Sequence, residues 1–373
     1  MQSLSGAEPG PNAPLLDWVR GIAALLVFAT HLRDASFVAF GFLPADEQTV
    51  FNAVWFALSR LGHEAVLIFF VLSGFLVGGR ELARFRAGDF DVGRYAAVRV
   101  ARIGIVCIPA VLLAWAVTAY AGTRLSAPTI LGNMVGLQSV AVPIIEADIP
   151  LWSLAYEIWF YVLCGAALCA ASPALRWSAV PIALGSLLVL TFVLDPSYLV
   201  FWLGGAAAFL WRPARTHLWL LALAILLLMA GTGLHQIGRG TYNATMQAVQ
   251  ASQGLRVSTV DGLGQWLFAA GAALLMPLLR SMDVLHDTKL AKLGAALAAV
   301  SYSLYLSHYP VLWFMNTFMP QAPEISLWTV AEMLLRGVAC IAVALAFYSL
   351  FERHTQRVRD YLLRMCSRKL AAD

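Results

Sequence analysis

The amino-acid sequence predicts an all-α integral membrane protein with about ten transmembrane helices and no appended soluble domain. Three observations support this prediction: 60% of the 373 residues are hydrophobic, only 12% are charged, and the apolar residues form long uncharged runs. A typical soluble domain has about 25% charged residues. A helix needs about 20 mainly apolar residues to cross a hydrocarbon core of about 30 Å, and several runs reach that length.

Six uncharged runs are long enough to cross a membrane alone, and four shorter ones need a flanking or internal charge to do so. In chain order, we expect spans near residues 15–33, 52–79, 98–121, 151–171, 175–194, 197–212, 217–235, 262–280, 293–319 and 327–351. The segment 122–150 carries no charge from 125 to 145, and we expect it to lie at the interface or to re-enter the membrane.

The distribution of lysine and arginine predicts the orientation. With ten spans, eighteen of these residues fall on the side of the two termini and four (Arg33, Arg124, Arg239 and Arg256) on the other side. Cytoplasmic loops carry the excess of positive charge, so we expect both termini in the cytoplasm. The expected organisation is a short polar tail (1–14), a transmembrane domain (15–352) and a basic cytoplasmic tail (353–373).

Composition and motifs exclude several classes of function. The net charge of +4 is explained by topology, so no nucleic-acid partner is expected. The five cysteines offer neither a disulfide framework nor metal-ligand spacing, and no metal is expected. The sequence has no glycine-rich phosphate loop, no GxSxG turn and no HExxH pair. Its chemistry therefore has to come from polar side chains inside the bundle.

The first span contains three ionisable residues, Asp17, Arg20 and His31. A charge at mid-membrane costs about 2.5–3.5 kcal/mol, so such residues are functional candidates. Arg20 and His31 are eleven residues apart, which places them on one helix face within about 20°. In the alternative interpretation, Asp17 and Arg20 form a structural pair and His31 marks the helix end.

Arginines and a small polar residue follow in the second and third spans. Arg99 and Arg102 are one turn apart at the cytoplasmic mouth of the third span, and paired guanidinium groups suit phosphate binding. Plain anchoring by positive charge is the alternative. Ser73 and Gly74 lie in the inner half of the second span, where small residues commonly allow close packing.

The later spans add a carboxylate and a hydroxyl-rich face. Glu157 shares a helix face with Ser153 and Tyr161, and it suits acid–base work or the orientation of a histidine. In the ninth span Ser301, Tyr305 and His308 share a face. In the tenth span Glu332 and Arg336 are four residues apart, and we expect a structural ion pair.

Five motifs occur in order along nearly the whole chain. They are Arg20 and His31 within LDWVRGIAALLVFATH, FFVLSGF at 69–75, Arg99 with Arg102, WSL at 152–154 with Glu157, Phe160 and Tyr161, and Ser301, Tyr302, Tyr305, Leu306, His308 and Pro310 of the ninth span. In these motifs the chain resembles the membrane acyltransferase-3 family, polytopic O-acyltransferases of bacterial envelope glycans and some small molecules. Glu64 departs from the family pattern and could belong to a substrate-specific pocket.

The resemblance implies a multi-pass protein of the bacterial inner membrane, surrounded by lipid, that moves an acyl group from cytoplasmic acyl-CoA to a hydroxyl. Acetyl-CoA is the expected donor, and a carbohydrate or a small molecule such as a macrolide is the expected acceptor. It assigns catalysis to His31, as general base or transient acyl carrier, and to Glu157. Acyl-CoA binding falls to Arg20, Arg99 and Arg102. The acceptor or the oxyanion is then assigned to Ser73, Ser301, Tyr305 and His308.

Two other classes of function stay open on the residues alone. Ten helices with buried His, Glu and Arg also fit a proton-coupled secondary transporter, although no inverted repeat is visible. A non-catalytic bundle that holds envelope enzymes together is the third possibility. Release of free CoA distinguishes a transferase from a transporter, and a non-catalytic bundle would tolerate replacement of His31 and Glu157.

Overall fold

The computed structural model describes residues 13–213, 217–246, 254–282, 285 and 288–370, so that most of the predicted polar tail and the last three residues of the basic tail lie outside the described residues. The helices of the first half are α1 (Pro14–Ser36), α2 (Val50–Leu58), α3 (Gly62–Ser73), α4 (Arg80–Arg86), α5 (Val92–Tyr120), α6 (Ala127–Met134) and α7 (Leu151–Ala170). They are followed by α8 (Arg176–Leu188), α9 (Pro196–Leu210), α10 (Leu218–Met246), α11 (Gly254–Ser281), α12 (Lys289–Asn316), α13 (Leu327–Leu350) and α14 (Thr355–Leu370).

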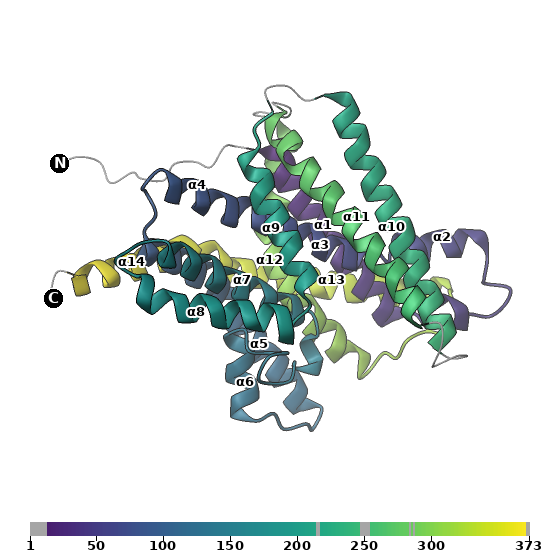
Figure 1. Cartoon of the computed structure of the whole chain (residues 1–373). Coiled ribbons are helices and arrows are strands. Elements are labelled where there is room, and N and C mark those ends of the chain that lie inside the picture. The colour runs from purple at the N-terminus through teal and green to yellow at the C-terminus, as the bar shows by residue number, and fades with distance from the viewer. Residues whose placement is uncertain (1–12, 214–216, 247–253, 283–284, 286–287, 371–373) are drawn as a thin grey trace.

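Five shorter segments complete the fold: the π-helices η2 (Gly74–Gly79) and η4 (Val189–Val193), and the 3-10 turns η1 (Phe40–Phe42), η3 (Glu146–Asp148) and η5 (Glu352–His354). No strand occurs in the part of the chain that the structure describes. Figure 1 shows the helices as one bundle, with α4 and α14 toward one end and α2 at the opposite end.

The predicted all-α membrane fold is confirmed. Within the described residues, nine helical segments are long and apolar enough to cross a membrane. The remaining predicted span, the sixth in chain order (197–212), is α9, which has 15 residues and is shorter than the others. The second span is not one regular helix, because α2, α3, η2 and α4 follow one another between Val50 and Arg86.

The segment 122–150 folds as an ordered helical loop, fastened by two buried amides. Asn133 donates to the carbonyls of Thr129 and Pro143 at 2.8 and 2.9 Å. Gln138 donates to the carbonyl of Leu151 at 2.8 Å, at the start of α7. Buried backbone groups need such partners outside regular structure. The loop therefore sets the position at which α7 begins.

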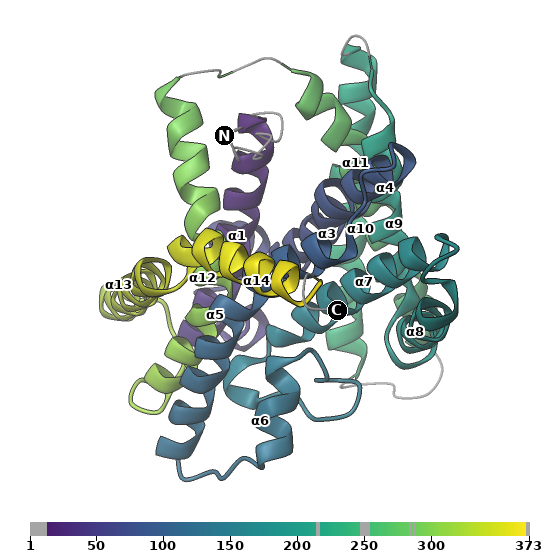
Figure 2. The ribbon, with the colours of Figure 1, turned by 90° about the vertical axis from the view of Figure 1, so that its left-hand side faces the viewer.

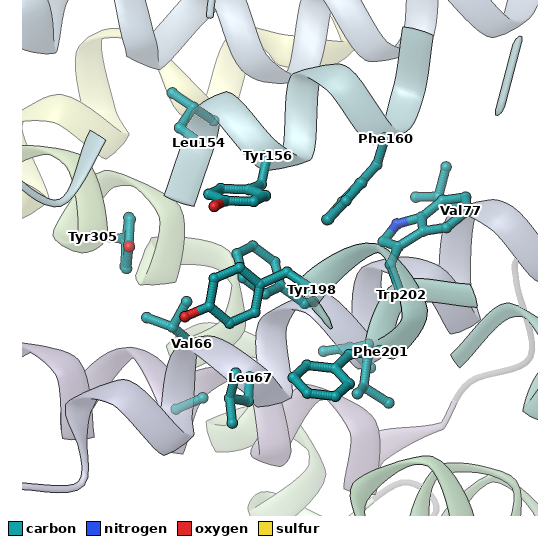
Figure 3. Packing of buried hydrophobic residues seen from close by; sticks show 14 of the residues in the cluster. Val66, Leu67, Val77, Leu154, Tyr156, Phe160, Tyr198, Phe201, Trp202 and Tyr305 are labelled. Atoms are coloured by element: carbon teal, nitrogen blue, oxygen red, sulfur yellow. The ribbon is translucent and has the colours of Figure 1, made fainter. Parts of the chain in front are cut away.

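Glycines let η2 and α9 pack backbone against backbone. A Cβ atom on Gly74 would lie 1.8 Å from the carbonyl oxygen of Trp202, and one on Gly205 would lie 2.0 Å from that of Val71. Only glycine fits at either position. This crossing continues into the aromatic part of the core, where Trp202, Phe160 and neighbouring rings pack together (Figure 3).

Candidate active site

A cavity of about 330 Å³ lies between α1, α3, η2, α5, α7 and α12. In Figure 2 these helices surround the centre of the bundle. Seven of the residues predicted from the sequence line the cavity: Arg20, Ser73, Arg99, Arg102, Glu157, Ser301 and Tyr305. Residues from five separate motifs thus converge on one space.

The cavity is rich in guanidinium groups. Arg20, Arg80, Arg99 and Arg102 line it, and Glu157 is the one carboxylate among its lining residues in the described chain. Aromatic rings hold two of these cations: Arg99 lies 5.5 Å from the centroid of Tyr161 and Arg102 lies 5.9 Å from that of Tyr302. Cation–π contacts of this kind fix a guanidinium without neutralising it. The space is therefore suited to an anionic ligand.

The two histidines form a pair between α1 and α12. His31 Nδ1 lies 2.8 Å from His308 Nε2, and the ring planes are inclined by 16° with their centroids 5.1 Å apart, so the rings lie edge to edge. His308 Nδ1 lies 2.8 Å from the carbonyl oxygen of Leu304, which can only accept. Nδ1 of a neutral His308 therefore carries the proton, and its Nε2 accepts from His31 Nδ1–H. This assignment leaves the lone pair of His31 on Nε2.

The histidine pair lies beside the cavity rather than in its wall. His31 and His308 are absent from the lining residues, whereas Tyr305 belongs to them. The Tyr305 ring is 6.3 Å from His308, and its hydroxyl is 2.6 Å from Ser153 Oγ. Tyr305 thus stands between the arginine-rich space and the histidines.

Glu157 is not hydrogen-bonded to either histidine. Its Oε1 accepts from the Tyr161 hydroxyl, and that hydroxyl lies 3.2 Å from Ser73 Oγ. The partner of His31 is His308 on α12 instead. Ser301, also expected to face a ligand, lines the cavity but donates to the carbonyl of Ala298.

The expected structural pairs form no direct ion pair within the described residues. Arg336 is buried and donates to the carbonyls of Ala35 and Met319 and to Asn316 Oδ1, so it joins the ends of α1 and α12. No ion pair joins it to Glu332, or Asp17 to Arg20.

Four residues near the site were not singled out by the sequence. Arg80 belongs to the counted positive charges, and nothing in its local pattern distinguishes it from an anchor. Trp202 lies in an apolar run, and Glu352 accepts from the backbone N–H and hydroxyl of Ser303 at 3.0 and 2.6 Å. Asp148, in η3, is fully buried, and burial raises its pKa well above the ordinary value.

Glu64 lies outside the lining of this cavity. It is 2% exposed and its Oε1 accepts from Gln236 Nε2 of α10 at 2.7 Å. No group of His, Cys, Asp and Glu that could hold a metal ion occurs among the described residues.

Comparison with known proteins agrees with the motifs. A family model described as an acyltransferase domain, that of the acyltransferase-3 family, matches residues 14–351. Neither the curated proteins nor the solved structures include a match. The family model covers all the helices that line the cavity and both histidines, and this multi-pass membrane protein therefore belongs to the acyltransferase-3 family.

Proposed function

We propose that the protein transfers an acyl group, acetyl in the first instance, from cytoplasmic acyl-CoA to a hydroxyl of a carbohydrate acceptor at the outer face of the bacterial inner membrane. The observation that supports this most directly is the arginine-rich cavity beside the His31–His308 pair. The positive charge of the cavity suits an anionic thioester donor, and the free lone pair of His31 suits a general base or a nucleophile.

The donor phosphates bind Arg99, Arg102 and Arg20 in this proposal. Guanidinium groups pair with phosphate through two parallel N–H···O bonds, which fixes orientation as well as charge. Arg80 adds a fourth cation to the same wall. With the phosphates held there, the pantetheine arm runs along α1 and carries the thioester past Tyr305 toward His31.

His31 carries the chemistry in this proposal. Its Nε2 removes the proton of the acceptor hydroxyl, the oxygen attacks the thioester carbonyl, and the C–S bond breaks. The proton then passes to the CoA thiolate, so that the products are an ester and free CoA. The same lone pair also suits direct attack on the thioester, with an acyl-histidine intermediate that the acceptor hydroxyl resolves.

Two further groups support the transition state. His308 holds His31 in the tautomer with a basic Nε2, which is the orienting role expected of Glu157 from the sequence. Glu157 stabilises the developing imidazolium through its charge rather than through contact. Tyr305 is the donor for the oxyanion, and Ser301, whose proton goes to the Ala298 carbonyl, can accept from the acceptor hydroxyl.

Free thiol release by the purified protein in nanodiscs tests the proposal. We expect wild type to release CoA from acetyl-CoA in the presence of a glycan acceptor, and His31→Ala to lose about 10²–10⁴-fold, the usual worth of a general base. His217→Ala, at an exposed histidine before α10, is the matched control and keeps wild-type turnover. Uptake of labelled substrate without thiol release would support the transporter instead.

A further inference from the structure

The hydroxyl of Ser73 is used differently from several other helical hydroxyls of this chain. Thr30, Ser186 and Thr191 each donate to the carbonyl four residues earlier in their own helix. Ser73 instead lies 3.2 Å from the hydroxyl oxygen of Tyr161 on α7. A hydroxyl that bonds across helices rather than to its own turn ties two elements together.

The indole of Trp202 extends this contact into a chain of hydrogen bonds. Its Nε1 donates to Ser73 Oγ at 3.2 Å, and the Tyr161 hydroxyl donates to Glu157 Oε1. An indole N–H can only donate, and an ionised carboxylate can only accept. Each bond therefore has one allowed direction, from Trp202 through Ser73 and Tyr161 to Glu157. Bonds aligned in this way polarise and strengthen one another.

The fold places Trp202 by backbone contact rather than by side-chain packing alone. The carbonyl of Trp202 lies where a Cβ of Gly74 would be, so α9 touches η2 directly after Ser73. The indole is 3% exposed and packs against the Phe160 ring, with centroids 5.6 Å apart (Figure 3). Trp202 is not among the residues that line the cavity, so it reaches a ligand there only through other residues.

From this geometry we infer that Trp202 is a positioning residue for Glu157, acting through Ser73 and Tyr161. The inference rests on the proposed function and deepens it. It removes Ser73 from the acceptor-binding groups, because its hydroxyl is committed between Trp202 and Tyr161. It also makes a residue outside the cavity a determinant of kcat.

A double-mutant cycle tests the inference. Trp202→Phe removes the terminal donor and keeps a ring, and Tyr161→Phe cuts the link to Glu157. We expect Trp202→Phe to lower kcat about three- to tenfold, the worth of one net hydrogen bond, with the KM for acetyl-CoA unchanged. In the Tyr161→Phe background the same change should lower kcat no further. Trp266→Phe, at a 45% exposed indole on α11, is the matched control.

The variants distinguish hydrogen bonding by Trp202 from packing by its ring. If Trp202→Phe lowers kcat by the same factor in the wild-type and the Tyr161→Phe backgrounds, the indole acts by packing and the inference is wrong. The inference is also wrong if the kcat of Trp202→Phe equals that of Trp266→Phe. The same cycle, followed by thermal unfolding in detergent, measures the coupling of the two residues without activity. If the wild-type protein releases no thiol, the proposed function is wrong. If the Tm shifts of Trp202→Phe and Tyr161→Phe add up in the double variant, the two residues are not coupled and the hydrogen-bonded chain is wrong, whatever the activity.

Discussion

His31 Nδ1 and His308 Nε2 lie 2.8 Å apart, although 277 residues separate them in the chain. The carbonyl oxygen of Leu304 accepts a hydrogen bond from His308 Nδ1–H, so His308 Nε2 is free to accept from His31. The contact between the two histidines therefore determines which nitrogen of His31 is basic. We predict that His308→Leu, which offers no acceptor, lowers kcat by up to about 10²-fold, as misplacement of a reacting group does. His308→Gln retains an acceptor oxygen and should recover part of that loss. Equal activity in the two variants, at equal thermal stability, would contradict the tautomer assignment.

The paired arginines of α5 give a second prediction. Arg99→Ala and Arg102→Ala should each raise the KM for acetyl-CoA about tenfold or more, since a hydrogen bond to a charged group contributes about 1.5–3 kcal/mol. Initial rates of thiol release measure the change. Arg94→Ala, one helical turn or more before them and outside the cavity lining, is the control. If all three variants raise KM alike, the cavity does not hold the phosphates and these residues serve only as anchors.

A third prediction concerns Arg336, whose guanidinium donates to carbonyls at the ends of α1 and α12. Arg336→Ala should lower the Tm markedly, because each buried acceptor left without a donor costs about 1–3 kcal/mol. Glu332→Ala should leave the Tm nearly unchanged, because no direct ion pair joins the two residues. Thermal unfolding in detergent compares them. If Glu332→Ala lowers the Tm as much as Arg336→Ala does, an ion pair between the two residues is the main contribution of Arg336 to stability.

Asp148 gives a fourth prediction, on pH. Neither of its carboxyl oxygens has a hydrogen-bond partner, and burial raises its pKa well above 3.8. The folded protein therefore keeps a proton that the unfolded chain loses, so stability falls as pH rises above that value. The expected slope is about 1.4 kcal/mol per pH unit until the folded pKa is reached. Apparent Tm measured between acidic and neutral pH should show a flatter profile for Asp148→Asn, whereas Asp46→Asn, at an exposed position, should keep the wild-type slope.

A fifth prediction concerns orientation. Helices α4 and α14, whose sequences contain several arginines, lie toward one end of the bundle (Figure 1), and we expect this end in the cytoplasm. Green fluorescent protein fused after residue 373 should fluoresce, and alkaline phosphatase fused there should be inactive. The reverse pair of results would place the arginines on the outer side and exclude a cytoplasmic donor.

The spans could be predicted because membrane thickness and backbone hydrogen bonding allow few alternatives for long apolar runs. Local spacing predicted that Arg99 and Arg102 face the same way, and both line the cavity; Arg20 and Glu157, which the family resemblance assigned to the same site, line it as well. What the sequence did not contain was the pairing between distant helices. Nothing within one span shows that His31 meets His308, or that Ser73 meets Trp202, since those contacts depend on how the bundle closes.

Interruptions of the helices were equally hard to foresee. The span expected at 52–79 was predicted as one helix, yet it changes to a π-helix at Gly74. Arg33 was counted among the residues on the outer side, but it is 6% exposed and donates to the carbonyl of Phe56. In both cases the decisive partner belongs to another part of the chain, as tertiary contacts commonly override local preference.

The contact of η2 with α9 at Gly74 and Gly205 also constrains the wall of the cavity. With no side chain between the two backbones, α9 supports η2 and the end of α3 directly, and only those two segments of the described chain contribute lining residues at this point. Ser73 precedes Gly74 and Arg80 follows η2, so two side chains that line the cavity depend on a backbone crossing that only glycine permits.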